Sequence, residues 1–327
     1  MASVPTAKTA SPLEGSVPSP HVATAEVRVP ALVRARHAAS YIARALAETW
    51  RTFRTAPRGD RAELAAMVLR MRAKHFLIKL APRWNFRGER VFGWNVECFD
   101  YYELITTIEI IFLSREYRFA PRSTRPRILD CGSNIGVSLL FFKKEFPDCT
   151  IQAFEPDPQT FALLRKNVEQ NSLAGVELYN RAVAGAAGER DFFCDPAHPG
   201  STSMSLRPEC RLLRRETVEA VLLSDFVGEG VDLLKLDVEG AELEVIEELV
   251  RSGAIARIHQ IVVEYHPALF PGKEGLGWLR QTLEASGFGC ETRSGEATPD
   301  DTSMAYPITL YARRDAAGCP ARGEMER

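Results

Sequence analysis

The segment ILDCGSNIGVS, residues 128–138, decides the fold class of this chain. Its first residues form a short apolar strand, a turn with glycines follows directly, and the residues after the turn have the composition of a helix. Gly132 and Gly136 allow the backbone to come close to a ligand, and the first turn of the helix offers N–H groups without intrahelical partners. A strand, a glycine turn and a helix in this order predict the first unit of a nucleotide-binding α/β sheet.

The sequence after residue 125 repeats this alternation of strands and helices. Strands are expected at 127–131, 150–154, 176–183, 191–194, 231–236, 258–265, 289–292 and 308–313. Helices are expected at 137–146, 160–171, 243–250 and 275–286. The strands at 231–236 and 258–265 are almost continuously apolar, which is typical of strands buried on both faces of a parallel sheet. The order of these elements predicts a Rossmann-like, doubly wound α/β domain.

Two acidic residues at the ends of the first two strands indicate the class of cofactor. Asp130 ends the first strand, where a carboxylate suits the ammonium group of a methionine moiety and would repel a pyrophosphate. Glu155 ends the second strand, roughly 20 residues after the glycine turn, where an acid can accept both hydroxyls of a ribose. The turn has the pattern G-x-N-x-G instead of G-x-G-x-x-G, so an NAD-dependent oxidoreductase is the weaker alternative.

Ionisable side chains also follow two later strands, at the edge where open α/β sheets bind ligands. The run DVEGAE puts Asp237 and Glu239 at the end of one apolar strand. The run EYH puts Glu264 and His266 at the end of the next. His266 is the first candidate for a general base because its ordinary pKa lies near neutrality, and Asp237 is the second. Asp237 and Glu264 could instead hold a magnesium ion, although we expect a site without metal.

The runs ILDCGSNIGVS, AFEPDP, LYNRAVAG, DLLKLDVEGAE and VVEYH resemble, in this order, the FkbM family of O-methyltransferases, which use S-adenosyl-L-methionine (SAM). The resemblance covers about residues 115–290. It implies a class I methyltransferase fold, with a mostly parallel seven-stranded sheet and SAM at the carboxyl edge of the strands. The catalytic residues are then expected to be His266, Asp237 and Glu239. The expected cofactor-binding residues are Tyr117, Asp130, Gly132, Ser133, Asn134, Gly136, Glu155, Pro156, Asn180, Ala182 and Asp237.

Within that set, the resemblance places the turn residues near the methionine part of SAM, Glu155 at the ribose, and Asn180 and Ala182 near the adenine. It implies transfer of a methyl group to a hydroxyl oxygen of a small molecule or glycan, as in natural-product or sugar O-methylation. Two alternatives remain: a SAM-binding protein without turnover, and a methyltransferase acting on a nitrogen or carboxylate acceptor. Because the strand 231–236 leads into DVEG, without the Asn/Asp-Pro-Pro-aromatic cluster of base-amine methyltransferases, no nucleic-acid partner is expected.

The charge of the chain changes near residue 125. Residues 26–127 hold 20 Lys and Arg against 10 Asp and Glu, whereas residues 128–327 hold 20 against 32. This asymmetry supports a domain boundary. We expect a disordered tail over 1–25, a basic helical region over 26–120, the SAM-binding domain over 121–314 and a C-terminal tail over 315–327. The basic region is expected to form a lid over the site, to contact the acceptor, or to pair with the acidic domain of a second chain in a homo-oligomer.

Within the basic region, apolar residues recur at helical spacing and are surrounded by arginines. They are Leu32, Ala39, Ile42, Leu46, Trp50 and Phe53. We expect this stripe to pack on the core, with an anionic acceptor or a membrane surface as the alternative partner. Asp60 could cap a second helix that runs at least to Ala73. Residues 84–94 are expected to form a loop or hairpin, and residues 101–113 a helix that covers the active-site cleft.

The seven cysteines are scattered and include no CxxC pair, so neither a zinc knuckle nor a redox pair is indicated. Scattered thiols are typical of a reducing compartment. No apolar run approaches the roughly 20 residues that a membrane-spanning helix needs. We therefore expect a cytoplasmic protein without a transmembrane segment.

Overall fold

The computed structural model describes residues 31–81, 83–194, 214–270, 275–294 and 307–314. The expected tails over 1–25 and 315–327 lie outside the described residues. The chain separates into two compact units, residues 1–44 and 45–327. All strands of the described residues belong to the second unit, which therefore holds the candidate site.

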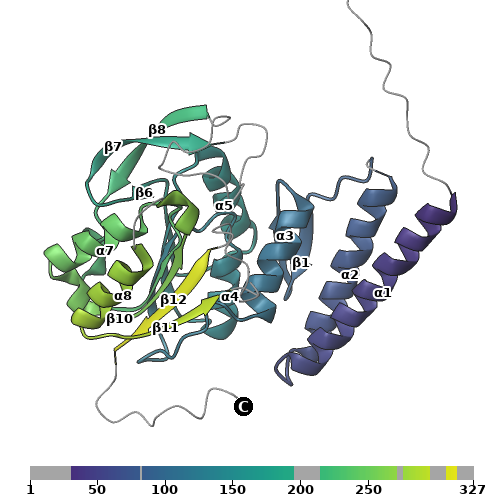
Figure 1. Cartoon of the computed structure of the whole chain (residues 1–327), viewed down its shortest axis with the longest axis horizontal. Coiled ribbons are helices and arrows are strands. Elements are labelled where there is room, and N and C mark those ends of the chain that lie inside the picture. The colour runs from purple at the N-terminus through teal and green to yellow at the C-terminus, as the bar shows by residue number, and fades with distance from the viewer. Residues whose placement is uncertain (1–30, 82, 195–213, 271–274, 295–306, 315–327) are drawn as a thin grey trace, which may run out of the picture. The chain divides into compact units, whose positions relative to one another are not determined.

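A seven-stranded sheet forms the centre of the second unit (Figure 1). Its spatial order is β11-β12-β10-β9-β3-β4-β5. The five strands from β10 to β5 are parallel, and β12 is antiparallel to both of its neighbours. The mostly parallel, doubly wound sheet predicted from the sequence is therefore confirmed. In chain order the strands are β3 (Arg127–Cys131), β4 (Thr150–Phe154), β5 (Val176–Tyr179), β9 (Val231–Leu236), β10 (Ile258–Tyr265), β11 (Gly289–Ser294) and β12 (Ile308–Arg313).

Helices cover both faces of this sheet, as Figure 1 shows. α4 (Val137–Glu145) and α5 (Pro158–Gln170) lie on one face, and α7 (Glu242–Arg251) and α8 (Gly275–Ala285) lie on the other. Each face has its own hydrophobic core, and successive residues of a strand contribute to opposite cores. Ile128 belongs to the core beneath α4, whereas Leu129 belongs to the core beneath α7. The short elements α6 (Ser224–Val227), η2 (Ala254–Arg257) and η3 (Pro267–Leu269) complete this part of the chain.

A second, three-stranded sheet lies beside the main one and was only partly predicted. It has the order β6-β8-β7, with β6 (Ala182–Val183), β7 (Gly188–Cys194) and β8 (Arg214–Val221). The single strand expected at 176–183 is wrong, because the chain leaves the main sheet after Tyr179 and β6 pairs with β8 instead. β8 was missed because charged and polar residues dominate its sequence, RRETVEAV.

The residues before the main sheet form helices and one hairpin. They are α1 (Ala31–Thr55), α2 (Arg61–Leu80), the hairpin of β1 (Gly88–Val91) and β2 (Trp94–Glu97), α3 (Tyr101–Ile108) and the π-helical turn η1 (Glu109–Leu113). Asp60 precedes α2 as predicted, but its side chain makes no capping hydrogen bond and instead pairs with Lys144 at 2.8 Å. Asp100 does cap α3, accepting the backbone N–H groups of Tyr102 and Glu103.

The expectation that the apolar stripe of α1 packs on the core is wrong. Leu46, Trp50 and Phe53 are 54%, 62% and 41% exposed. The buried face of α1 from residue 45 onward instead carries small side chains, Ala45 and Thr52 among them. Small side chains allow a neighbouring helix to approach closely, which leaves the bulky stripe on the outside.

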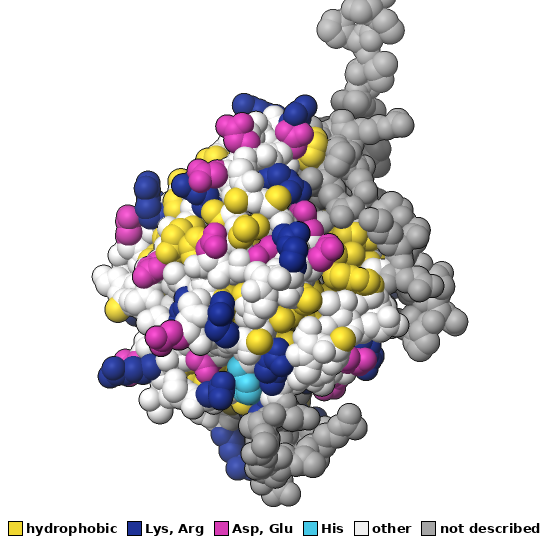
Figure 2. Space-filling view, turned by 90° about the vertical axis from the view of Figure 1, so that its left-hand side faces the viewer, with side chains coloured by type: hydrophobic (Ala, Val, Ile, Leu, Met, Phe, Trp, Pro, Cys, Tyr) yellow, Lys and Arg dark blue, Asp and Glu magenta, His cyan; other side chains and the backbone are white. Residues whose placement is uncertain are grey.

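Basic and acidic side chains are interspersed on the molecular surface shown in Figure 2, with hydrophobic patches between them. This face therefore has no extended region of purely positive or purely negative charge. Among the helices of the described residues, none combines the length and hydropathy that crossing a bilayer requires.

Candidate active site

The glycine turn after β3 passes very close to the end of β9. Gly132 has φ +83°, and a Cβ placed on it would lie 1.8 Å from the carbonyl oxygen of Asp237. Gly136 has φ +94° and precedes α4 directly. Asn134, between them, also has a positive φ of 47°. Glycine at position 132 is therefore required by both backbone conformation and space.

Beneath this turn, Asp130 and Lys235 form a buried pair of opposite charges. The sequence predicted a role for Asp130 but not for Lys235. The carboxyl group of Asp130 is fully buried, and its Oδ2 accepts a hydrogen bond from the Ser138 hydroxyl at 2.5 Å. Its Oδ1 lies 3.4 Å from Nζ of Lys235 and has no hydrogen-bond partner among the described residues. Lys235 donates to the carbonyl oxygen of Gly132 at 2.7 Å. The only sequence signal was one lysine within the otherwise apolar end of β9, LLKL.

Lys235 is the positive centre of a group of carboxylates. Its Nζ lies 3.3 Å from Oδ2 of Asp237 and 5.2 Å from the ring centroid of Tyr117. Burial lowers the pKa of Lys235, but Asp130, Asp237 and Glu264 raise it above its ordinary value. The ammonium group therefore stays charged in a place where an isolated charge would be costly.

Glu264 at the end of β10 joins this group through Tyr117. The Tyr117 hydroxyl donates a hydrogen bond to the Glu264 carboxylate across 147 positions of the chain. Burial, followed by the neighbouring Asp237, raises the pKa of Glu264 to about 7, against the opposing effect of Lys235. The structure thus brings Tyr117, predicted to bind cofactor, to the mouth of the sheet beside Asp237.

Glu155 lies at the end of β4 and faces the glycine turn. Its Oε2 accepts the backbone N–H of Asn134 at 3.0 Å, and its Oε1 accepts that of Asp157 at 2.9 Å. Burial raises the pKa of Glu155 to about 8, although both N–H groups oppose the increase. The side-chain amide of Asn180 donates to the carbonyl oxygens of Glu155 and Pro156 at 2.9 and 3.0 Å. Asn180 and Pro156 therefore help to hold the loop that carries Glu155.

His266 follows β10 and lies among three carboxyl groups. Its Nδ1 is 3.0 Å from Oε1 of Glu242, a fully buried side chain that also accepts the N–H of Gly240. Its Nε2 is 3.4 Å from Oε2 of Glu239 and 3.9 Å from Oδ1 of Asp237. The three predicted catalytic residues are therefore adjacent, and Glu242, in the first turn of α7, joins them.

The charges of this cluster bear on which group can accept a proton. Burial lowers the pKa of His266, but the hydrogen bond with Glu242 and the charge of Glu239 outweigh it and raise the pKa to about 10. Burial raises the pKa of Glu239 to about 9, opposed by His266. In this arrangement the imidazole carries a proton near neutral pH. This favours Asp237, the second candidate, over His266 as the proton acceptor.

A cavity opens at this edge of the sheet. Its lining includes Gly132, Asn134 and Asp237 from the strand ends. It also includes Leu104 and Thr107 of α3 and Ile110 of η1. The predicted helix at 101–113 therefore does cover the cleft, as α3 and the π-helical turn η1.

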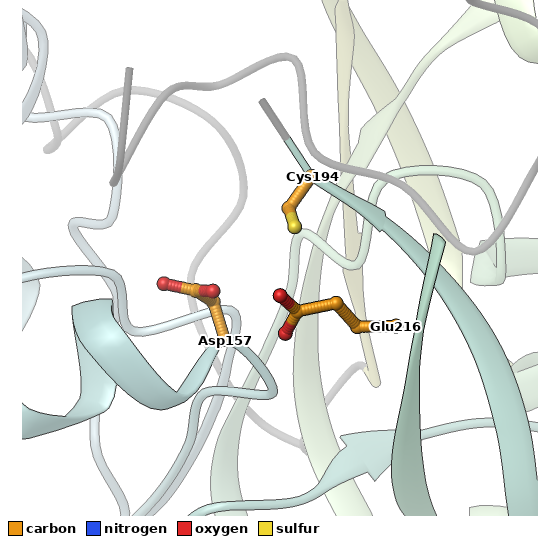
Figure 3. Close-up of side chains that lie close together, drawn as sticks. All are labelled: Asp157, Cys194 and Glu216. Atoms are coloured by element: carbon orange, nitrogen blue, oxygen red, sulfur yellow. The ribbon is translucent and has the colours of Figure 1, made fainter. Parts of the chain in front are cut away.

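Two groups of side chains have the residue types and spacing of metal ligands. One is Asp237, Glu239 and His266, whose donor atoms lie within 4.8 Å of one another. The other is Asp157, which precedes α5, with Cys194 of β7 and Glu216 of β8, and these three side chains lie close together (Figure 3). In the second group Oδ2 of Asp157 already accepts two hydrogen bonds from Thr160, and burial raises the pKa of the Cys194 thiol.

Comparison with known proteins gives consistent matches. The family model described as "Methyltransferase FkbM domain" matches residues 130–290. The chain is 30% identical over 226 residues to "Methyltransferase 1" of Beauveria bassiana, covering 63% of this chain and 88% of that protein. It is 31% identical over 250 residues to "Methyltransferase sdnD" of Sordaria araneosa, covering 62% and 91% respectively. It is 33% identical over 192 residues to "31-O-demethyl-FK506 methyltransferase FkbM" of Streptomyces tacrolimicus, covering 48% and 72%.

Proposed function

Because the chain belongs to the FkbM family of methyltransferases, we propose that it transfers the methyl group of SAM to a hydroxyl oxygen of a small molecule or glycan. One observation carries the proposal. The glycine turn with its buried acids and the cluster around His266 share one edge of the sheet, on either side of Asp237. The name of the Streptomyces tacrolimicus relative, which refers to a 31-O-demethyl compound, supports an oxygen acceptor.

The residues at this edge suit SAM in shape and charge. The absence of a side chain at Gly132 leaves the backbone open, and three carboxyl groups surround the single ammonium group of Lys235. Such an excess of negative charge complements a ligand with an ammonium and a sulfonium group. When bound, SAM supplies a methyl group on a positively charged sulfur. We propose that it is held by Tyr117, Asp130, Gly132, Ser133, Asn134, Gly136, Glu155, Pro156, Asn180, Ala182 and Asp237.

The acceptor hydroxyl must lose a proton when it becomes a methyl ether. We propose that Asp237 accepts this proton, since its carboxylate lies 3.9 Å from the Nε2 of His266 and lines the cavity. His266, held by Glu242, then balances the charge of Asp237. Assistance by a general base typically accelerates a reaction by about 10²–10⁴-fold.

The first test is binding of S-adenosylhomocysteine to the full chain by calorimetry, with NAD as the comparator. We expect binding of S-adenosylhomocysteine and none of NAD. The second test is methyl transfer from labelled SAM to matched hydroxyl, amine and carboxylate compounds. Transfer to a hydroxyl compound supports the proposal. Transfer only to an amine or a carboxylate would show that the acceptor is not a hydroxyl group.

Two variants test the assignment of the base. Asp237→Asn is expected to lower turnover by about 10²–10⁴-fold. Glu239→Gln is expected to lower turnover less, because this side chain contacts Nε2 of His266 and is not the proposed proton acceptor. Turnover of Asp237→Asn equal to that of the unmodified chain would remove the role of Asp237. A chain that binds S-adenosylhomocysteine but methylates none of the three classes would support a binding protein without turnover.

A further inference from the structure

Large apolar side chains are concentrated on the outside of α1 and α2. Of the twelve large apolar side chains that are exposed among the described residues, eight lie between residues 42 and 84. Single exposed apolar residues are common, but a group of this size marks a surface that contacts a partner. The six that lie on α1 and α2 from residue 45 onward, here named the outer apolar face, are Leu46, Trp50, Phe53, Leu69, Leu77 and Leu80.

The part of α1 from residue 45 runs antiparallel to α2. Glu48 pairs with Arg72 at 2.9 Å, and the side chain of Arg61 donates to the carbonyl oxygen of Ala56 at 2.8 Å. Ends that are close in sequence are therefore also close in space, as in a helical hairpin. This arrangement fixes which sides of the two helices face in the same direction.

Helix geometry places both apolar stripes on one side of this hairpin. On α1, Leu46 and Phe53 lie about 90° around the helix from the buried Ala45. On α2, Leu69 and Leu77 lie on the side opposite the inward-facing Leu64. Because the two helices are antiparallel, these positions place both apolar stripes on the same side of the hairpin, away from the core.

The surroundings of the outer apolar face are strongly basic. Residues 45–84 hold nine Lys and Arg against three Asp and Glu. Of the three acids, Glu48 pairs with Arg72 and Asp60 pairs with Lys144. Arg54 is exposed on α1, about 40° around the helix from Trp50 of the apolar stripe. The face is therefore an apolar strip with a cationic border.

We propose that the outer apolar face binds the surface of an anionic lipid bilayer. Apolar side chains would enter the headgroup region, Trp50 would lie at the interface that tryptophan prefers, and Arg54 would contact anionic headgroups. A second copy of the chain fits less well. A two-fold contact through this face would set arginine borders against each other without acids to balance them.

Vesicle co-sedimentation of the full chain tests this inference. We expect the protein to bind vesicles that contain phosphatidylglycerol, to remain free with phosphatidylcholine alone, and to dissociate as salt increases. Trp50→Ser and Arg54→Glu are each expected to weaken binding by about tenfold or more. The matched control is Trp278→Ser, which alters an exposed tryptophan of α8 outside the face.

Three outcomes would overturn the proposal. They are no binding by the unmodified chain, equal binding by Trp50→Ser, and a concentration-dependent dimer that Trp50→Ser dissociates without any vesicle binding. The last outcome would assign the face to a second copy. Because Trp50 lies outside the methyl-transfer site, affinity for S-adenosylhomocysteine should be the same in Trp50→Ser, so failure here is distinct from failure of the proposed function.

Discussion

Nδ1 of His266 lies 3.0 Å from Oε1 of Glu242, whose side chain is fully buried at the start of α7. This contact determines which ring nitrogen faces the protein interior and leaves Nε2 directed toward Glu239 and Asp237. A carboxylate on one imidazole nitrogen fixes the ring orientation and raises its basicity. Glu242 is therefore a positioning residue for the cluster that we propose to accept the proton.

Glu242→Gln should lower turnover by about 10–100-fold while the KM for SAM changes little. The physical reason is that an amide cannot hold the imidazolium of His266 by charge, so the ring loses both orientation and basicity. The descending limb of the pH–rate profile should also move to lower pH. The matched control is Glu244→Gln, on the same helix but paired with Arg190 at 3.1 Å. An unchanged profile, with only a loss of stability, would show that Glu242 is merely structural.

The protein should lose stability as pH rises from about 7 to 10. Burial raises the pKa of Glu264 to about 7, Glu155 to about 8 and Glu239 to about 9. The pKa of His266 is raised to about 10 despite its burial. For all four groups the folded pKa exceeds the unfolded one, so the folded state holds more protons and an increase in pH favours unfolding.

Calorimetric Tm values at pH 6.5, 8 and 9.5 would measure this effect. We expect the Tm to fall by roughly 3 °C or more across this series. Glu239→Gln should give a shallower decrease, because the amide does not titrate. A Tm that stays constant or increases with pH would contradict the assignment of raised pKa values to these groups.

Gly132→Ala should abolish S-adenosylhomocysteine binding and destabilise the fold. A Cβ at this position meets the Asp237 carbonyl oxygen at 1.8 Å, and the backbone is left-handed with φ +83°. Both costs act together, so we expect a loss of more than about 2 kcal/mol in the free energy of unfolding. The control is Gly277→Ala in α8, where no atom lies within 4 Å of the new Cβ. That change should stabilise by up to about 1 kcal/mol.

Lys235→Met should destabilise the protein by about 3–5 kcal/mol in chemical denaturation, because Asp130 and Glu264 would remain buried without a cation. The comparison is Lys143→Met. Lys143 is also buried, but it donates to the backbone carbonyl oxygens of Cys149 and Pro147 and pairs with no carboxylate in the described residues. Its loss should cost about 1–2 kcal/mol. Equal losses in the two variants would mean that charge balance at Lys235 is unimportant.

Local sequence patterns predicted those turns and strands whose residues do not depend on a distant partner. The glycine turn required Gly132 and Gly136, and their positive φ values agree with the motif. β9 and β10 were recognised because strands covered on both faces are apolar at almost every position. β8 was missed for the opposite reason, since it belongs to a small sheet and carries charges on its exposed side.

The candidate site was predicted as a set of positions at one sheet edge, but its chemistry was not. Asp237, Glu239 and His266 were named because they follow adjacent parallel strands, and parallel strands end at the same edge. The role of Lys235 in balancing them could not be read from LLKL, where one polar residue among apolar ones has many explanations. The exposure of the outer apolar face could not be predicted either. Helical spacing shows that an apolar stripe exists, but not which side of α1 packs against α2.

The strands and helices of the main sheet, the glycine turn and the ionisable residues at the strand ends follow from the amino-acid sequence alone. The pairs that these and other residues form could be found only in the folded chain: Tyr117 with Glu264, Lys235 with Asp130, and His266 with Glu242. Secondary structure follows from the periodic burial of each segment, whereas the pKa of a side chain follows from burial and from charges on distant segments.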